Sequence, residues 1–358
     1  MELTVQAPDV LPAQDDEVLS RLVRVARTRG LVDLAEALVA LNTFVAEDLS
    51  AIESELARTP TREDLVGHSA RHLLDLEGKR LRPLCVSLAS RLGSGWSDRV
   101  LRLAAAVELV HNATLLHDDV VDSGDQRRGK PTARVQYGNA ASVFAGDYLL
   151  VHALKQVRRA DVDGLLDRLL DIIDEMIRAE AVQLEQRGRL RAERGVYFHI
   201  VEGKTASLFR WAMIAGGRAG GLEWTACEAL ARFGNDLGMA FQIVDDALDL
   251  AGDEAATGKS LFADLIEGKL TFPLLVGLER DASLHAVIDD VIRTQSPVTP
   301  ELSERILSSL KDNGAIDAAF ELATEYAERG RRHLERLPPS SARDGLELVA
   351  RVAVNRRG

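Results

Sequence analysis

Two aspartate-rich stretches interrupt long segments that otherwise have the composition of buried helix. LLHDDVVD, residues 115–122, and QIVDDALD, residues 242–249, share one spacing of three aspartates. A buried carboxylate without a partner costs on the order of several kcal/mol, so packing alone does not account for these residues. In a helix, positions i and i+4 lie on one face, and like charges at that spacing repel. Each stretch therefore requires a cation opposite its paired carboxylates.

The rest of the chain has the composition and periodicity of an all-α protein. Apolar residues make up 46% of its 358 residues, enough for a substantial core, while aromatic residues make up only 4%. Ala and Leu are frequent and favour helices, and no alternating strand pattern is found. We expect a single-domain helical bundle over residues 31–358, preceded by a flexible or helical extension over residues 1–30. The helices that we predict span about 64–75, 82–93, 97–121, 139–159, 162–187, 194–217, 223–251, 271–279, 283–295, 300–312, 314–336 and 341–355.

Charge and cysteine content exclude several classes of protein. The net charge of −12 argues against a general nucleic-acid binder, which needs a basic surface. Cys85 and Cys227 lie far apart in helical stretches, which suits a reduced interior and gives no disulfide framework. The first residues contain no apolar run of the secretory type, and charges interrupt every long apolar run before about 18 residues. We therefore expect a cytoplasmic protein without a transmembrane segment.

The ligand type of the two acidic stretches predicts a hard divalent cation. No His or Cys set accompanies the aspartates, and carboxylate oxygens are the ligands of Mg²⁺ or Mn²⁺. One such stretch is more often a solvated acidic face, but two of them in apolar helices favour a metal site. Two opposed pairs across a bundle would hold a diphosphate between metal ions. The metal-binding aspartates that we predict are Asp118, Asp119, Asp122, Asp245, Asp246 and Asp249.

Basic residues occur at helix starts and turns near these stretches. GKRLRP, residues 78–83, places three cations at a predicted loop-to-helix junction, where a helix N-terminus already attracts anions. RRGKPT, residues 127–132, follows the first acidic stretch, and Lys204, Lys259 and Lys269 each follow a glycine. A single Gly-Lys pair is usually a solvated turn. The recurrence beside carboxylates is instead typical of a metal-diphosphate site with direct phosphate contacts.

These motifs together resemble the trans-type isoprenyl diphosphate synthases, the polyprenyl synthetase family. The resemblance runs in order from about Gly78 to Leu275. The stretches that carry it are GKRLRP, ELVHNATLLHDDVVDSGDQRRGKPT, GNAASVFAGDYLL, EGKTASLF, GMAFQIVDDALDL and GKSLFADLIEGKLTFPLL. The family pattern differs at one place, because many members carry Gly-Gly where this chain has Leu76 and Glu77. This replacement bears on how flexibly that loop closes.

The resemblance implies a fold, a reaction and residue roles. The fold would be the isoprenoid synthase bundle with a central active-site cavity. The reaction would condense an allylic diphosphate head-to-tail with isopentenyl diphosphate to an all-trans product. Asp118, Asp122 and Asp245 would bind Mg²⁺, with Asp119, Asp246 and Asp249 assisting. The allylic diphosphate would be held by Arg127, Lys204, Lys259 and Lys269. Isopentenyl diphosphate would be bound by Lys79, Arg82, His111 and Arg128. Thr205 and Gln242 would line the reacting carbons.

The resemblance also bears on product length and assembly. The residues four and five positions before the first DDxxD, Thr114 and Ala113, are small, where short-chain enzymes usually have an aromatic residue. Val110, one helical turn deeper, is not aromatic either. This favours a medium- or long-chain product, of the kind used for quinone side chains, with Phe144 or Tyr148 as candidates for the tunnel floor. Family members are usually homodimers, and the apolar helix at 97–121 would suit the interface.

Three other functions stay open at this point. The first is a short-chain synthase that makes farnesyl or geranylgeranyl diphosphate. The second is a terpene cyclase, although cyclases usually replace the second DDxxD and lack GKRLRP. The third is a non-catalytic subunit, although such subunits lose acidic motifs that are intact here.

Overall fold

The computed structural model describes residues 31–59, 62–76, 78–190, 193–251, 261–294 and 297–355, together with Leu19, Val23, Arg24 and Arg27. The chain divides into two compact units, residues 1–44 and 45–358. The second unit contains both acidic stretches. Lys259 and Glu77 lie outside the described residues, as does most of the predicted extension at 1–30.

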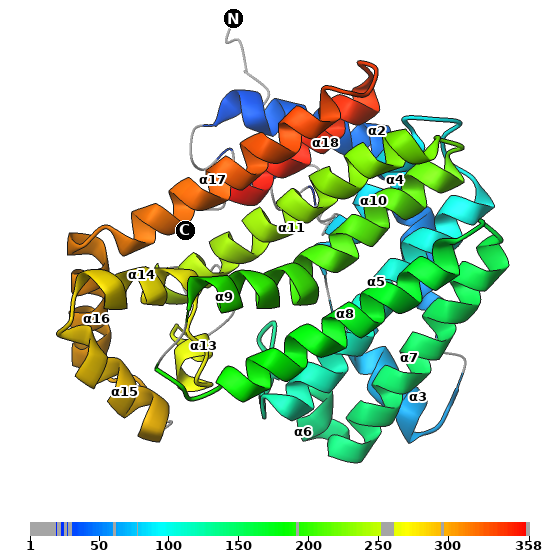
Figure 1. Cartoon of the computed structure of the whole chain (residues 1–358). Helices are drawn as coiled ribbons and strands as arrows, with labels where there is room; N and C mark the ends of the chain where they lie inside the picture. The colour runs from blue at the N-terminus through cyan, green and yellow to red at the C-terminus, as the bar shows by residue number, and fades with distance from the viewer. Residues whose placement is uncertain are drawn as a thin grey trace, which may run out of the picture. The chain divides into compact units, whose positions relative to one another are not determined.

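The structure is almost entirely helical, which confirms the predicted fold class (Figure 1). Each predicted helix between residues 64 and 355 is present, with ends within a few residues of the prediction. Among the described residues, no helix combines the length and apolarity needed to cross a membrane. The elements are α2 (Val32–Ala57), α3 (Leu65–Leu74), α4 (Leu81–Ser90), α5 (Asp98–Val121), β1 (Gln126–Arg127), β2 (Lys130–Pro131), α6 (Ala133–Tyr137), α7 (Asn139–Ala160), α8 (Leu165–Gln186), α9 (Arg194–Val201), η1 (Glu202–Ala206), α10 (Ser207–Ala219), α11 (Trp224–Ala251), α13 (Ala263–Ile266), α14 (Phe272–Arg280), α15 (Leu284–Thr294), α16 (Pro300–Asp312), α17 (Ala315–Leu334) and α18 (Ser341–Val354).

Side-chain caps explain several of the helix starts. Asp64 accepts a hydrogen bond from the Gly67 amide at 3.0 Å and begins α3. Ser97 accepts from Val100 at 3.4 Å and begins α5. Such caps satisfy amides that have no partner within the helix. The start of the first acidic helix is therefore encoded locally.

The two helices that carry the acidic stretches are the inner helices of the second unit. Helix α5 packs against α3, α4, α7 and α10, while α11 packs against α10, α17, α18 and η1. Figure 1 shows α17 and α18 running over α11. Leu103, Leu109 and Leu116 of α5 and Phe233 of α11 are fully buried. The aspartates thus lie on helices whose other faces make the core.

The burial of α5 contradicts the prediction that the helix at 97–121 forms a subunit interface. Its apolar side chains pack within the same chain, and Val121 at its end is its one exposed large apolar residue. The prediction was wrong because a long apolar pattern does not distinguish a central helix from an interface helix. Exposed apolar side chains occur instead on α7 and α8.

A short β-hairpin follows the first acidic stretch and was not predicted. Gln126 pairs with Pro131 and Arg127 with Lys130. The two residues at the turn, Arg128 and Gly129, have positive φ values of 53° and 73°. A two-residue turn with positive φ values matches the twist of the strands that it joins. A residue other than glycine, such as Arg128, adopts a positive φ at some cost in free energy. The strands of the hairpin are too short to give a recognisable sequence pattern.

One turn of π-helix, η1, separates α9 from α10 within the predicted helix at 194–217. Two glycines let the neighbouring helices approach this turn. A Cβ atom at Gly203 would lie 2.6 Å from the Ala179 Cβ on α8, and one at Gly238 of α11 would lie 2.4 Å from the Ala206 Cα. Such distances are shorter than van der Waals contact, so both positions require glycine. π-Helical turns are frequently found at functional sites.

We expect Gly238→Ala to lower stability by about 1–3 kcal/mol, because overpacking would push α11 away from η1. Thermal unfolding measures the effect. Gly195→Ala on α9 is the matched control, since a Cβ there meets nothing within 4 Å. That change should be neutral or stabilise by up to about 1 kcal/mol, as expected for glycine in a helix. Equal melting temperatures for the two variants would contradict the close approach of α11 to η1.

Candidate active site

Two adjacent residues of η1 join the two acidic helices. The Lys204 ammonium lies 3.3 Å from Asp118 Oδ2 on α5 and 2.5 Å from Glu180 Oε2 on α8. The Thr205 hydroxyl donates a hydrogen bond to Gln242 Oε1 on α11 at 2.8 Å. Because neighbouring residues reach both helices, Asp118 and the start of the second acidic stretch face a common space.

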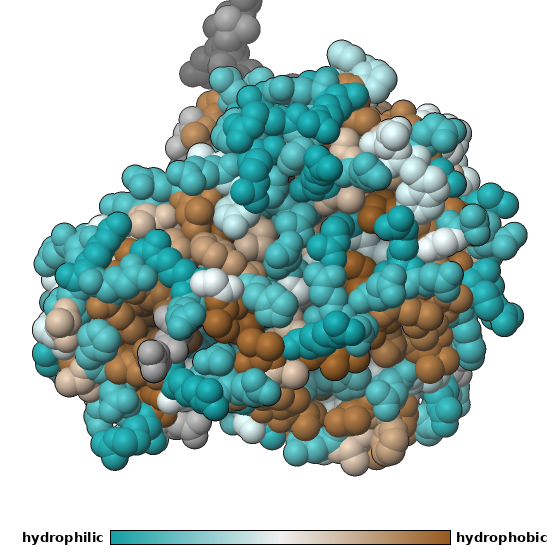
Figure 2. All heavy atoms as spheres, in the orientation of Figure 1, coloured by the Kyte–Doolittle hydropathy of each residue, from teal (hydrophilic) through white to brown (hydrophobic). Residues whose placement is uncertain are grey.

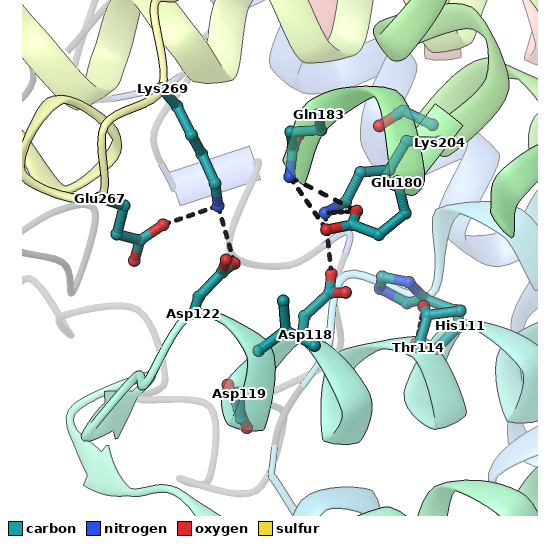
Figure 3. A network of polar contacts seen from close by, with 12 residues as sticks. His111, Thr114, Asp118, Asp119, Asp122, Glu180, Gln183, Lys204, Glu267 and Lys269 are labelled. Carbon is teal, nitrogen blue, oxygen red and sulfur yellow. Dashed lines mark hydrogen bonds and ion pairs between the residues drawn. The ribbon is translucent and has the colours of Figure 1, made fainter. Parts of the chain in front are cut away.

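A second connection runs through residues 261–269, after α11. The Lys269 ammonium lies 2.7 Å from Asp122 Oδ2 and 2.6 Å from Glu267 Oε2. The Asp264 amide donates to Asp249 Oδ2 at 3.4 Å. Figure 3 shows both lysines directed at the same side of α5. The structure therefore brings together four predicted site residues: Asp118, Asp122, Lys204 and Lys269.

Each of these lysines forms ion pairs with an aspartate of α5 and with a glutamate from another segment. Burial alone would lower the pKa of Lys204, but Asp118 and Glu180 raise it overall. Burial would likewise lower the pKa of Lys269, whereas Asp264, Glu267 and Asp122 raise it. Both side chains are thus held as ammonium ions. They balance the like charges that the i, i+4 spacing places side by side.

Asp119 lies on a different face of α5 and pairs with the hairpin. It is 2% exposed, and Figure 3 shows it pointing away from both lysines. The Arg127 guanidinium donates to Asp119 Oδ1 at 2.9 and 2.7 Å. This ion pair ties the hairpin to the end of the acidic stretch. Arg127 was predicted to hold a diphosphate, and the structure places it against Asp119.

Asp246 is buried within a hydrogen-bonded group on α11. Tyr197 of α9 donates to Asp246 Oδ2 at 2.7 Å, and Gln242 donates to Oδ1 at 2.8 Å. Burial, and then the charge of Asp264, raise the pKa of Asp246 to about 7, although both hydrogen bonds lower it. Burial and Asp246 raise the pKa of Tyr197 well above its usual value, so its hydroxyl stays a donor. Asp245 and Asp249, one turn apart, are only partly buried.

The predicted second group of cations surrounds His111. Burial, followed by Arg82, Arg128 and Arg127, lowers the pKa of His111 well below its usual value. Arg128 donates to the Leu76 carbonyl at 2.9 Å. The Arg82 guanidinium lies 4.4 Å from the Phe209 ring centroid, and its buried Nε has no hydrogen-bond partner. The arginines therefore converge from α4 and the hairpin on one face of α5.

Neighbouring cations of the GKRLRP stretch have separate positions. The Lys79 ammonium lies 5.4 Å from the Phe241 ring centroid, beside α11. Arg80 is buried and contacts Glu53 at 2.6 Å and Glu108 at 2.8 Å, so it joins helices of the core. Arg80 adopts a positive φ of 41° just before α4 begins. Arg80 and Arg82, two residues apart, thus have different partners.

Sequence reasoning missed several side chains of the site because their partners are remote. Glu180 and Gln183 lie on α8, and Glu267 and Arg187 lie near Lys269. Arg187 donates to the Glu267 carbonyl at 2.7 Å and lies 3.5 Å from Asp122. Glu267 belongs to the EGK stretch that was noted for its lysine alone. Glu180 and Gln183, three residues apart on one helix face, were the available signal on α8.

The predicted chain-length residues lie along α5 in two environments. Ala113 and Val110 are buried, while Thr114 is partly exposed and donates to the His111 carbonyl at 2.8 Å. Gly146 lets α7 approach α5 at this level, since its Cβ would lie 3.0 Å from the Ala113 carbonyl oxygen. Phe144 is 59% exposed, so within one chain it does not form a tunnel floor. Tyr148 packs its ring 4.4 Å from that of His152.

Comparison with known proteins agrees with this geometry. A family model described as polyprenyl synthetase matches residues 63–310. The chain belongs to the polyprenyl synthetase family. The matched range contains both acidic stretches, the hairpin, η1 and the segment around Lys269.

Individual relatives match over most of their length. Heptaprenyl diphosphate synthase component 2 of Geobacillus stearothermophilus is 35% identical over 316 residues, which cover 87% of this chain and 97% of the relative. The all-trans-nonaprenyl-diphosphate synthase (geranyl-diphosphate specific) of Rhodobacter capsulatus is 34% identical over 330 residues, which cover 91% of this chain and 97% of the relative. Proteins named geranylgeranyl diphosphate synthase also match. The relatives therefore include both long- and short-chain synthases.

A solved structure shows the same fold. The polyprenyl synthase from Caulobacter crescentus CB15, complexed with calcium and isoprenyl diphosphate, superimposes with a TM-score of 0.81 at 34% identity. The match covers 96% of this chain and all of that chain. The predicted isoprenoid synthase fold is thereby confirmed.

We expect the free energy of unfolding to decrease as the pH is lowered below 6.5, because of His111. The unfolded chain binds a proton there at its usual pKa near 6.5, whereas the folded protein excludes it, so folding weakens as the pH falls. Between pH 6.5 and 5.5 wild type should lose about 1 kcal/mol more than His111→Asn. Urea unfolding at each pH measures this difference. His285→Asn, at an exposed position, is the control and should follow wild type. Parallel curves for wild type and His111→Asn would contradict a neutral imidazole in the folded protein.

Proposed function

We propose that the protein condenses an allylic diphosphate with successive isopentenyl diphosphate units to a medium- or long-chain all-trans polyprenyl diphosphate. One observation carries this proposal: Lys204 and Lys269 reach Asp118 and Asp122 from two segments that also contact α11. Two carboxylates and two ammonium groups are thus concentrated in one space. Membership of the polyprenyl synthetase family supports the same reaction.

The carboxylates fit a hard divalent cation that arrives with the diphosphate. Among the described residues, no three side chains of His, Cys, Asp or Glu are gathered closely enough to hold a metal ion unaided. Mg²⁺ usually binds one or two carboxylates and completes its shell with water and substrate phosphate. Asp122 Oδ1 makes no hydrogen bond and lies 3.5 Å from the Arg187 guanidinium, so it can serve as a ligand atom. We propose Asp118, Asp122, Asp245 and Asp249 as ligands, and Mg²⁺ when bound would act as a Lewis acid on the leaving diphosphate.

The side chains around this space have distinct tasks. A diphosphate would compete with Asp118 and Glu180 for the Lys204 ammonium group, and with Asp122 and Glu267 for that of Lys269. These lysines would then stabilise the charge that develops on the leaving group. Lys259, outside the described residues, and Arg127 remain further predicted contacts of the allylic diphosphate. No nucleophilic side chain is required, because the double bond of isopentenyl diphosphate attacks the allylic cation left when diphosphate departs, and a proton is then lost to the departed diphosphate.

Isopentenyl diphosphate, the second substrate, would bind where Arg82 and Arg128 converge near His111. Arg82 and Arg128 flank a neutral His111, which can accept or donate a hydrogen bond without adding charge. Lys79, over the Phe241 ring, lies at the α11 side of this group. Thr205 and Gln242, in contact with each other, would line the reacting carbons between the two diphosphates.

We expect Asp118→Asn to lower kcat by about 100-fold or more, the usual effect of losing one charge-stabilising group at such a site. Its fold should persist because Lys204 keeps Glu180 as a partner. The assay is condensation of labelled isopentenyl diphosphate with an allylic diphosphate and Mg²⁺. Asp98→Asn on the same helix is the control, since Asp98 pairs with Arg102 at 2.8 Å and is exposed. Near-normal turnover of Asp118→Asn, or turnover in excess EDTA, would refute the metal-diphosphate site.

The small side chains on α5 favour a long product. Substitution of the partly exposed Thr114 tests this with less disturbance of the core than substitution of the buried Ala113. Thr114→Phe places a ring four residues before Asp118 at a partly exposed position, so it can be accommodated without disrupting the core. Elongation past the ring would require overpacking, which should favour release of shorter products roughly tenfold. Chromatographic sizing of dephosphorylated products measures the shift. Val135→Phe, at an exposed position on α6, should keep the wild-type length. An unchanged product from Thr114→Phe would show that the tail does not pass this residue.

We also propose a homodimer, formed through α7 and α8. Exposed apolar residues recur every seven positions on α8, at Leu170, Ile177 and Leu184. Val143, Phe144 and Val151 are exposed on α7. Figure 2 shows hydrophobic surface where these two helices lie in Figure 1. A surface of this kind on a protein is a common mark of an interface.

Sedimentation equilibrium tests the homodimer. We expect twice the mass of one chain for wild type and the mass of a single chain for Ile177→Asp, because a charge would then be buried in the interface. A single-chain mass for wild type would contradict the homodimer. It would favour a different subunit, as the name of the relative called component 2 implies for that protein.

A further inference from the structure

Three hydrogen bonds connect four side chains from three elements, at the place where the proposed function puts the reacting carbons. Thr205 of η1 donates to Gln242 Oε1 at 2.8 Å, and Gln242 Nε2 donates to Asp246 Oδ1 at 2.8 Å. Tyr197 of α9 donates to Asp246 Oδ2 at 2.7 Å. Tyr197, Thr205 and Asp246 are buried, so water does not readily replace these partners. The sequence resemblance assigned no role to Tyr197.

The chemistry of the four groups gives this chain of hydrogen bonds a direction. The two hydrogen bonds end on different oxygens of Asp246, so Asp246 accepts from both the Tyr197 hydroxyl and the NH₂ end of Gln242. The amide oxygen of Gln242 must then face Thr205, because the two ends of an amide are opposite in character. The Thr205 hydroxyl therefore donates its single proton to Gln242. Its oxygen lone pairs remain for other contacts.

The position of Tyr197 is fixed by aromatic packing. Its ring centroid lies 5.4 Å from that of Phe198 and 5.9 Å from that of Phe272 at the start of α14. The Tyr197 hydroxyl donates to Asp246 Oδ2, whereas Gln242 donates to Oδ1. Without it, one carboxylate oxygen would lack a donor and the carboxylate could rotate away from Gln242.

We propose that Tyr197, acting through Asp246, is a positioning residue that orients Gln242 and makes Thr205 present oxygen lone pairs to the reacting carbons. This inference rests on the proposed function, in which positive charge develops on the allylic carbon. A lone pair facing that carbon stabilises the charge in the transition state, whereas a hydroxyl proton facing it would oppose the charge. Tyr197 donates to Asp246 and is not among the residues proposed to bind either diphosphate, so its effect should fall on the chemical step.

The first test is steady-state kinetics of Tyr197→Phe, which removes only the hydroxyl. We expect kcat to fall roughly tenfold, as for one lost hydrogen bond, while KM for both diphosphates stays within about twofold. Tyr326→Phe on α17 is the matched control, because Tyr326 is half-buried and packs on Arg329 outside the chain of hydrogen bonds. A rise in KM with unchanged kcat, or an equal loss in both variants, would overturn the proposal.

A double-mutant cycle separates positioning from general loss of structure. Thr205→Val keeps the shape of the side chain and removes the group through which Tyr197 is proposed to act. In that background Tyr197→Phe should lower kcat by less than about twofold, because coupled residues are not additive. A full tenfold loss in both backgrounds would show that Tyr197 acts independently of Thr205 and would refute the proposal.

The last test does not depend on turnover. In protein labelled with ¹⁵N on glutamine side chains, the Gln242 amide signal is assigned by its loss in Gln242→Glu. We expect Tyr197→Phe to shift this signal and speed its hydrogen exchange, and Tyr326→Phe to leave it unchanged. An unshifted signal in Tyr197→Phe overturns the proposal. If wild type shows no condensation, the proposed function fails, and the amide signal still decides whether Tyr197 orients Gln242.

Discussion

The pairing of two lysines with two aspartates on α5 is the interaction on which the site depends. Asp118 and Asp122 repel each other on one helix face, and their helix is otherwise buried. Lys204 and Lys269 remove this repulsion, and each also neutralises a glutamate. The lysines come from segments on either side of α11 in the sequence, so the same contacts fix the second acidic helix opposite the first. A site rich in charge is thereby made compatible with a buried core.

Close approach of backbones makes these charge contacts possible. Gly203 and Gly238 allow α8 and α11 to reach the π-helical turn, where Lys204 and Thr205 point to different helices. The hairpin after α5 adds Arg127 to Asp119 and Arg128 to the group around His111. Two kinds of anion site result, one with lysines among carboxylates and one with arginines around a neutral imidazole. This difference suits two diphosphates, of which only one leaves during the reaction.

Much of this arrangement was predictable from sequence because its signals are local. Helical periodicity and caps such as Ser97 indicate the helices, and the repeated aspartate spacing indicates which faces carry charge. The pairing of Lys204 with Glu180 and the contact of Tyr197 with Asp246 were not predictable, because their partners are remote in sequence. The burial of α5 was missed for a related reason. An apolar pattern gives the amount of surface to be buried but not the partner that buries it.

A crystal structure of wild type with Mg²⁺ and an allylic thiolodiphosphate, whose sulfur linkage resists cleavage, tests the central claim most directly. We expect the diphosphate to lie between α5 and α11, with metal ions on Asp118, Asp122 and Asp245. The Lys204 and Lys269 ammonium groups should contact diphosphate oxygens at about 2.7–2.9 Å, the range for charge-assisted hydrogen bonds. A diphosphate bound elsewhere, with both lysines still on Asp118 and Asp122, would contradict the site described above.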